Sequence, residues 1–256
     1  MILSNIHTIL NTFNSISLDD MNAVKLMQRT DTKFIFHANQ LAHILELTKT
    51  DYSVLEINNT RISDYQTLYY DTSDFGLYQA HLHGKLNRYK VRYRNYINSH
   101  TGNLEVKFKS NKGKTIKSRL KASEPSLAWN SEAIQFIKTL TPFDPATLVP
   151  SLWVNYSRIT LVNLNTKERL TFDLHIEFIN GTNTKKLHPL IIAEVKKEKA
   201  KGSPFFLIMK HLAIKEVSLS KYGMAMAYTE PTIKTNRFKE TLRSIKKITD
   251  YDFITN

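Results

Sequence analysis

The sequence of 256 residues contains no cysteine, and it has only seven glycines and seven prolines. Without cysteine the protein has no disulfide framework, no zinc–thiolate site and no thiol nucleophile. The few glycines and prolines are scattered, so no linker divides the chain. Because a chain of this length buries a sizeable core, we expect one domain over residues 1–256.

Long hydrophobic runs are absent as well. No segment approaches the roughly 20 apolar residues that a membrane-spanning helix needs. The N-terminus has neither the basic region nor the continuous apolar region of a signal peptide. These absences predict a soluble, cytoplasmic protein.

Positive charge, in contrast, is abundant. The chain has 36 Lys and Arg against 23 Asp and Glu, which gives a formal net charge of +13. Such a field attracts phosphate-rich polyanions, which include nucleic acid, anionic membrane and condensed phosphate. Net charge alone does not distinguish these ligands. The positions of the charges along the chain are needed to do so.

Periodicity predicts an α+β fold with an antiparallel sheet. Eight segments have the pattern of strands: 25–36, 65–71, 88–97, 103–110, 114–121, 151–164, 168–179 and 188–197. Seven segments have helical patterns: 2–14, 39–48, 73–82, 131–139, 205–213, 220–228 and 236–248. Asn39 and Ser220 are predicted N-caps. Strands in hairpin order, interrupted by short helices, favour this class over a parallel sheet.

Charged side chains recur at every second residue of these strands. Because successive strand side chains point to opposite faces, each such series becomes a charged wall on one face. The series are Arg88, Lys90, Arg92 and Arg94; Glu105, Lys107 and Lys109; Thr115, Lys117 and Arg119; Arg169, Thr171, Asp173, His175 and Glu177; and Glu194 and Lys196.

One strand of this kind is usually the wet face of a half-buried sheet. Five strands dominated by Lys and Arg would repel one another unless an anion or a metal–anion complex lay between them. The pattern therefore favours an eight-stranded barrel with the charges inside and helices packed outside. Arginine offers bidentate donors to phosphate, and lysine acts as a point charge.

The presence of carboxylates in such a wall needs an explanation other than phosphate binding, because carboxylates repel phosphate. Glu105, Asp173, Glu177 and Glu194 make sense there if some of them hold Mg²⁺ or Mn²⁺. The alternatives are a salt bridge between Asp173 and an arginine, and an ion pair between Glu194 and Lys196. The histidines show no metal-ligand spacing, so no zinc is expected.

The sequence also resembles a known family, the catalytic domain of vacuolar transporter chaperone (VTC) polyphosphate polymerases, within the triphosphate tunnel metalloenzymes. The resemblance covers residues 24–228. It is carried by ordered blocks that include RTDTKFIF, TLYYDTSDFGLYQAHLHGKLNRYKVRYRNY, LEVKFKSNKGKTIKSR, YSRITL, ERLTFDL, IIAEVK and SLSKYG.

The resemblance implies an eight-stranded tunnel in which ATP donates its γ-phosphate to a polyphosphate chain. It assigns catalytic basic positions to Lys33, Lys90, Arg92, Lys107 and Arg169. It assigns phosphate binding to Lys117, Arg119, Arg158, Lys196, Ser220 and Lys221. It implies that Glu194 holds Mn²⁺ or Mg²⁺. The charge pattern adds Glu105 and Asp173 as further metal candidates.

Two departures from the family pattern stand out. Lys90 occupies a position where arginine is usual, and the acidic pattern of the first strand is reduced to Asp31. Coupling synthesis to translocation at the inner face of a membrane would require a separate membrane protein partner.

The ligands expected are ATP, polyphosphate, triphosphate or pyrophosphate. Inorganic triphosphatase and a non-catalytic polyphosphate-binding module remain alternatives, because fold and ligand class transfer more safely than activity. Nucleic acid is not expected, because Tyr89 and Tyr93 lie opposite the basic face and cannot stack bases beside it.

Overall fold

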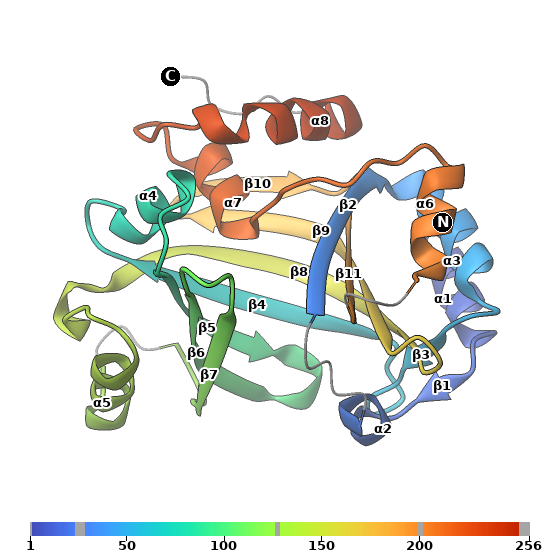
Figure 1. Cartoon of the computed structure of the whole chain (residues 1–256), viewed down its shortest axis with the longest axis horizontal. Coiled ribbons are helices and arrows are strands. Elements are labelled where there is room, and N and C mark those ends of the chain that lie inside the picture. The colour runs from blue at the N-terminus through green and yellow to red at the C-terminus, as the bar shows by residue number, and fades with distance from the viewer. Residues whose placement is uncertain (1, 24–28, 126–128, 199–201, 251–256) are drawn as a thin grey trace.

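The structure is a computed structural model that describes residues 2–23, 29–125, 129–198 and 202–250. One curved sheet runs through it, with eight strands in the order β2-β11-β9-β8-β4-β5-β6-β7, all paired antiparallel (Figure 1). Their bounds are β2 Arg29–His37, β4 Ile62–Asp71, β5 Arg88–Tyr96, β6 Thr101–Lys109, β7 Thr115–Lys121, β8 Val149–Asn163, β9 Glu168–Asn180 and β11 Leu190–Glu198. The antiparallel α+β class predicted from the sequence is confirmed.

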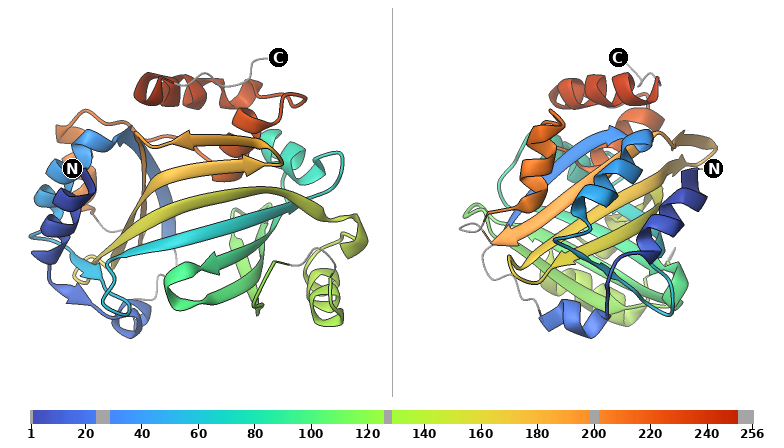
Figure 2. Two further views of the ribbon diagram at one scale, coloured as in Figure 1. Left: turned by 180° about the vertical axis from the view of Figure 1, so that it is seen from behind. Right: turned by 90° about the vertical axis from the view of Figure 1, so that its right-hand side faces the viewer.

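Four of the helices cover the outer face of this sheet. A first group packs on β2, β8, β9 and β11 at one end (Figure 2): α1 Ile2–Asn11, α3 Leu41–Thr48 and α6 Pro204–His211. Helix α5, Ser131–Leu140, packs on the outer face of β4, β5 and β6. The remaining helices are α2 Leu18–Ala23, α4 Gly76–Leu82, α7 Lys221–Thr229 and α8 Lys239–Thr249.

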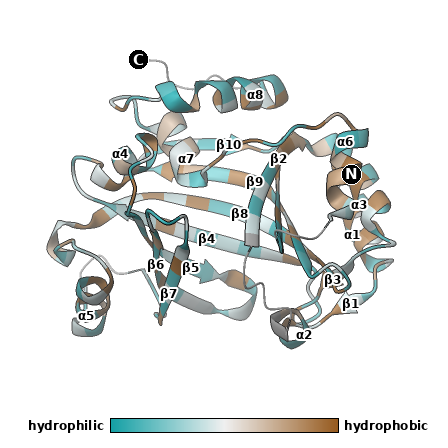
Figure 3. Cartoon of the chain, in the orientation of Figure 1, coloured by the Kyte–Doolittle hydropathy of each residue, from teal (hydrophilic) through white to brown (hydrophobic). Residues whose placement is uncertain are grey.

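The period-two pattern sorts side chains between the two faces as expected, and hydropathy alternates along the strands (Figure 3). On β5, Val91 and Tyr93 are buried outside beneath α5, while Lys90 and Arg92 point to the inner face. Burying an apolar side chain such as Val91 contributes roughly 1.5–3 kcal/mol. The apolar half of the pattern therefore fixes where the charged half lies.

The inner face is not charged along its whole length. Lys33 on β2 and Glu194 on β11 are followed on the same face by Ile35 and Ile192, which are buried. Helix α7 covers this apolar half, and its residues Tyr222 to Thr229 are all buried. The charged part of the face is thus confined to one half of the sheet, a difference from the expected charged lumen.

A β-bulge makes one part of the charge pattern differ from the prediction. The register between β8 and β9 shifts near His175, which has a left-handed φ of 52°. An inserted residue reverses the side-chain alternation beyond it. His175 therefore reaches Ser157 on the outer face, and Glu177 bonds Asn155 there. The prediction that His175 and Glu177 share a face with Asp173 is wrong.

The short elements were not foreseen. Strands β1 (Ser15–Ile16) and β3 (Ser53–Leu55) pair in parallel, β10 (Asn183–Leu187) pairs antiparallel with β9, and α2 precedes β2. Two to six residues are too few for a periodic signal. Residues 25–28 of the first predicted strand lie outside the described residues.

The two predicted helix caps have different outcomes. Ser220 caps α7 by accepting a hydrogen bond from the Gly223 amide at 3.3 Å, as predicted. Asn39 caps nothing with its side chain. Its backbone N–H instead donates to Nδ1 of His37 at 3.1 Å. This bond lies at the start of the 3₁₀ turn Ala38–Gln40, which leads into α3. The prediction for Asn39 is wrong because that turn moves the start of α3 to Leu41.

Strands β2 and β7 are the two edges of the eight-strand path, and no strand pairing joins them within the described ranges. Closure of the barrel therefore stays a prediction. In the part of the chain that the structure describes, no helix has the length and apolar character for a membrane crossing.

Candidate anion-binding site

A cavity of about 1490 Å³ adjoins the charged half of the inner face. Its lining comes from β2, β5, β6, β7, helix α4 and the segment before α7. Five of the predicted site residues line it: Lys33, Lys90, Lys107, Lys117 and Ser220. Side chains from four strands and one helix start, far apart in sequence, thus meet around one volume.

Glu105 anchors the first group of cations behind this cavity. It is 1% exposed and contacts the guanidinium groups of Arg92 and Arg119, at 2.7 Å and 3.1 Å, and the amine of Lys117. Burial alone would raise the pKa of Glu105, but Arg92, Arg94 and Lys117 hold it below the usual range. The carboxylate is therefore ionised and already shared among three cations.

Asp173 anchors the second group. Arg158 donates to its two carboxylate oxygens at 2.6 Å and 2.9 Å, and Lys221 contacts it from the start of α7. Burial opposes ionisation of Asp173, but the two cations outweigh it and lower its pKa. The salt-bridge alternative considered for Asp173 is the arrangement that forms.

Glu194 anchors the third group. Its carboxylate lies 3.1 Å from Nζ of Lys33 and 3.2 Å from Nζ of Lys196. Burial would raise its pKa, yet Lys196 and Lys33 hold the pKa well below the usual value. The ion pair with Lys196 that the sequence allowed is therefore present.

Tyrosine rings support the arginines of the inner face. Tyr65 and Tyr156 stack at 5.1 Å, and the Arg158 guanidinium lies 5.2 Å from the centre of each ring. Nζ of Lys221 lies 4.8 Å from the ring of Tyr156. Cation–π contacts of this kind hold the cations in place without adding negative charge. The sequence analysis did not assign these tyrosines a role.

Three lysines of the cavity lie in strongly cationic surroundings. Burial, with the charge of Arg92 next, lowers the pKa of Lys107 to about 8 and that of Lys117 to about 7. Burial and then Lys107 lower the pKa of Lys90 well below its ordinary value. Nearby cations thus add to the effect of burial on each of these pKa values, and a bound polyanion would offset their mutual repulsion.

His81 also lines the cavity, from helix α4. Its Nδ1 atom is buried without a hydrogen-bond partner. Burial and then Lys90 lower its pKa to about 3, so the ring is neutral at physiological pH. The sequence predicted only an ordinary surface or core role for this histidine, because it is the docking of α4 beside β5 that places it here.

Six of the predicted cations do not line this cavity. Arg169 is on the inner face of β9, but its guanidinium donates to the Met21 carbonyl at 3.3 Å, at the end of α2. The Arg119 side chain is 57% exposed, although it reaches Glu105. The other four, Arg92, Arg158, Lys196 and Lys221, form ion pairs with Glu105, Asp173 and Glu194.

The three carboxylates differ in their fitness for a metal ion. Among the described residues no group of three His, Asp or Glu side chains gathers as a metal site. All three carboxylates contact cations, but the side chains of Glu105 and Asp173 are 1% and 0% exposed, whereas that of Glu194 is 15% exposed and open to a ligand. Glu194 lies near Asp31, which lines the cavity and pairs in register with Lys196. One or two carboxylates completed by phosphate oxygens are enough for Mg²⁺, so Glu194 fits.

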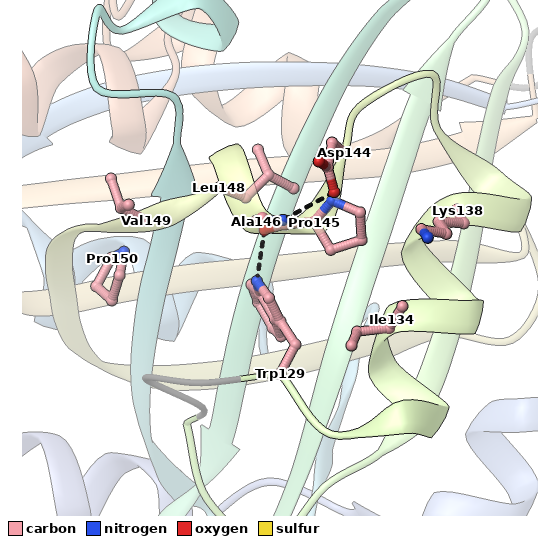
Figure 4. A pocket seen from close by; sticks show the side chains of 9 residues that line it. All are labelled: Trp129, Ile134, Lys138, Asp144, Pro145, Ala146, Leu148, Val149 and Pro150. Atoms are coloured by element: carbon pink, nitrogen blue, oxygen red, sulfur yellow. Dashed lines mark hydrogen bonds between the residues drawn. The ribbon is translucent and has the colours of Figure 1, made fainter.

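A second cavity, of about 370 Å³, lies between α5 and the start of β8 (Figure 4). The indole of Trp129 borders it and donates a 2.8 Å hydrogen bond to the Pro145 carbonyl. Apart from Lys138 and Asp144 its lining is apolar, and none of the predicted site residues borders it.

Fold and site together define a class of protein: one face of a curved antiparallel sheet gathers cations around a cavity suited to a polyanion. The family model of the VTC domain matches residues 28–230. The chain therefore belongs to the VTC-domain family, as the sequence blocks predicted. No curated protein matches this sequence.

Solved structures of similar fold share little sequence with the chain. A putative adenylate cyclase from Vibrio parahaemolyticus is 10% identical, with 79% of this chain and 99% of that chain covered and a TM-score of 0.46. A putative adenylyl cyclase from Hippeastrum, described as having a dominant triphosphatase activity, is 14% identical, with 78% and 95% covered and a TM-score of 0.45.

Proposed function

We propose that this protein binds ATP and polyphosphate in the cavity and transfers the γ-phosphate of ATP to the end of a polyphosphate chain. One observation carries the proposal: lysines from four strands converge on one cavity, whose described lining has eight cations against two carboxylates. Membership of the VTC-domain family supports condensed phosphate as the ligand class.

The transfer needs positioning and charge stabilisation more than covalent chemistry. A terminal oxygen of the chain forms a bond to the γ-phosphorus, the bond from that phosphorus to the β,γ-bridging oxygen breaks, and ADP leaves. Arg92 and Lys107 neutralise the equatorial oxygens of the phosphoryl group that is transferred. Lys90 and Ser220 orient the phosphate group next to it. These groups are held in advance by Glu105 and by α7, so little reorganisation is needed.

Glu194 is the residue that would hold a divalent ion, Mn²⁺ or Mg²⁺. The ion would supply further neutralisation of phosphate oxygens. Lys33 and Lys196, which contact Glu194, would then turn toward phosphate. The same site would act as a triphosphatase if water replaced the chain end as the acceptor.

The test is incubation of the purified protein with ATP labelled in its γ-phosphate and with Mn²⁺. We expect labelled long-chain phosphate, loss of that product in Lys107→Met, and full activity in Lys247→Met, which changes an exposed lysine of α8. Released phosphate without long chains would favour the triphosphatase alternative. Binding of polyphosphate without turnover of ATP would favour the non-catalytic module.

A further inference from the structure

A histidine lies among the cations that surround the cavity. His81, in the last turn of α4, borders the cavity together with Arg88, Lys90 and Lys107. Helix α4 packs beside β5, the strand that carries Arg88 and Lys90. The centre of the His81 ring lies 6.0 Å from that of Phe238. Packing therefore holds one part of the imidazole, while another part borders the cavity.

The two ring nitrogens of His81 have different surroundings. Nδ1 is buried and has no hydrogen-bond partner, and Nε2 is the nitrogen that remains to face the cavity. A buried N–H without an acceptor is rarer in proteins than a buried acceptor without a donor. A neutral imidazole carries one proton, on either nitrogen. We therefore expect the proton of His81 on Nε2.

The surroundings of His81 also keep its ring uncharged. A second proton would place a buried N–H without an acceptor at Nδ1, close to Lys90, Arg88, Lys109 and Lys107. Burial, followed by the charge of Lys90, lowers the pKa of His81 to about 3. His81 thus differs from the lysines beside it, because it offers one N–H in a fixed direction and no positive charge.

We infer that His81 contacts bound condensed phosphate directly, donating a hydrogen bond from Nε2 to an oxygen of the phosphate group that Lys90 and Ser220 orient. This inference rests on the proposed function, and it adds a binding residue for which the sequence predicted only an ordinary role. A lysine ammonium on its flexible stem acts as a point charge, whereas a hydrogen bond from a packed ring is directional. His81 therefore fixes the rotation of a phosphate group that the lysines attract.

The first test measures His81 in the wild-type protein by ¹⁵N NMR of histidine-labelled full chain. The His81 resonances are those that disappear in His81→Gln. We expect the shifts of a neutral ring with its proton on Nε2, and a change in the Nε2 resonance when tripolyphosphate is added with chelator present. A charged ring, a proton on Nδ1, or an Nε2 resonance that tripolyphosphate leaves unchanged would overturn the inference.

The second test uses two substitutions that place an N–H at different distances from the backbone. The side-chain amide of glutamine reaches about as far as Nε2 of histidine, whereas that of asparagine reaches only as far as Nδ1. By calorimetry with chelator present, His81→Gln should bind tripolyphosphate within about threefold of wild type. His81→Asn should weaken binding by about tenfold or more, because a hydrogen bond to a charged group is lost.

His83→Asn, at the exposed C-cap of α4, is the matched control and should bind as wild type does. Equal affinity in His81→Gln and His81→Asn would show that the reach of the N–H is irrelevant and would overturn the inference. Failure of the wild-type protein itself to bind tripolyphosphate would instead overturn the proposed function, so the two failures are distinct.

Discussion

Lys90 on β5 donates a 2.7 Å hydrogen bond to Oγ of Ser220, the residue that caps α7. The same hydroxyl accepts from the Gly223 amide, so one oxygen joins the charged strand to the start of the helix. A Cβ at Gly223 would lie 2.8 Å from the ring of Phe238, so that ring would have to shift. The position of α7 over the sheet and the orientation of Lys90 are therefore linked.

Replacing Ser220 by alanine should affect stability and binding together. Loss of the cap should lower the free energy of unfolding by about 1 kcal/mol, as measured by urea denaturation. Polyphosphate binding should weaken, because Lys90 loses the partner that orients it. Ser220→Thr keeps the hydroxyl and serves as the control. Full binding in Ser220→Ala would contradict the link between Lys90 and the cap.

Glu105→Gln should destabilise the free protein strongly. The change removes a buried counter-charge from the partly exposed Arg92 and Lys117. Breaking a fully buried pair costs about 3–5 kcal/mol, which is the upper bound here. Glu56→Gln, in the more exposed pair with Arg61, should cost no more than about 1 kcal/mol. Urea denaturation measures both. Added tripolyphosphate should restore part of the loss in Glu105→Gln, and equal effects of the two changes would contradict the assignment.

The lysines of the cavity predict a dependence on pH. The pKa values of Lys107 and Lys117, about 8 and about 7, lie below the ordinary 10.5 of lysine. Between these values the unfolded chain binds more protons, so the stability of the free protein rises with pH. A polyanion favours the charged lysines, so its affinity should fall as the pH rises through 7 and 8.

Calorimetric titration of tripolyphosphate in buffers of different ionisation enthalpy measures this effect as proton uptake. The uptake should shrink in Lys107→Arg, because arginine stays charged throughout this range. The phosphate groups of the ligand also titrate, so wild type and variant are compared at the same pH. Equal uptake in the two proteins would remove Lys107 from the explanation.

Glu194→Gln should separate metal binding from phosphate binding. We expect loss of Mn²⁺ binding by electron paramagnetic resonance, and a fall in metal-dependent activity of about a hundredfold, since a metal contributes several kcal/mol. Binding of tripolyphosphate in chelator should persist or tighten, because a negative charge has been removed. Glu177→Gln, on the outer face of β9, is the matched control. An unchanged Mn²⁺ signal in Glu194→Gln would rule out this residue as the ligand.

Part of the site could be predicted from the sequence. The alternation in 88–94 and 104–109 placed Lys90, Arg92, Glu105 and Lys107 on one face, and the structure brings them together. That inference works because strand side chains alternate strictly while the apolar set is buried. It failed at His175, where one inserted residue reversed the alternation and nothing in the local sequence signalled the bulge.

Sequence alone determined the strands, the outer apolar face and the excess of cations on the inner face, since each follows from periodicity within a single segment. The tertiary structure decided what those cations do. Packing places α7 over half of the inner face, carries His81 and Tyr156 into the charged half, and leaves β2 and β7 as edges. Such arrangements depend on contacts between segments far apart in the chain. The residue pattern along a single strand does not predict these contacts.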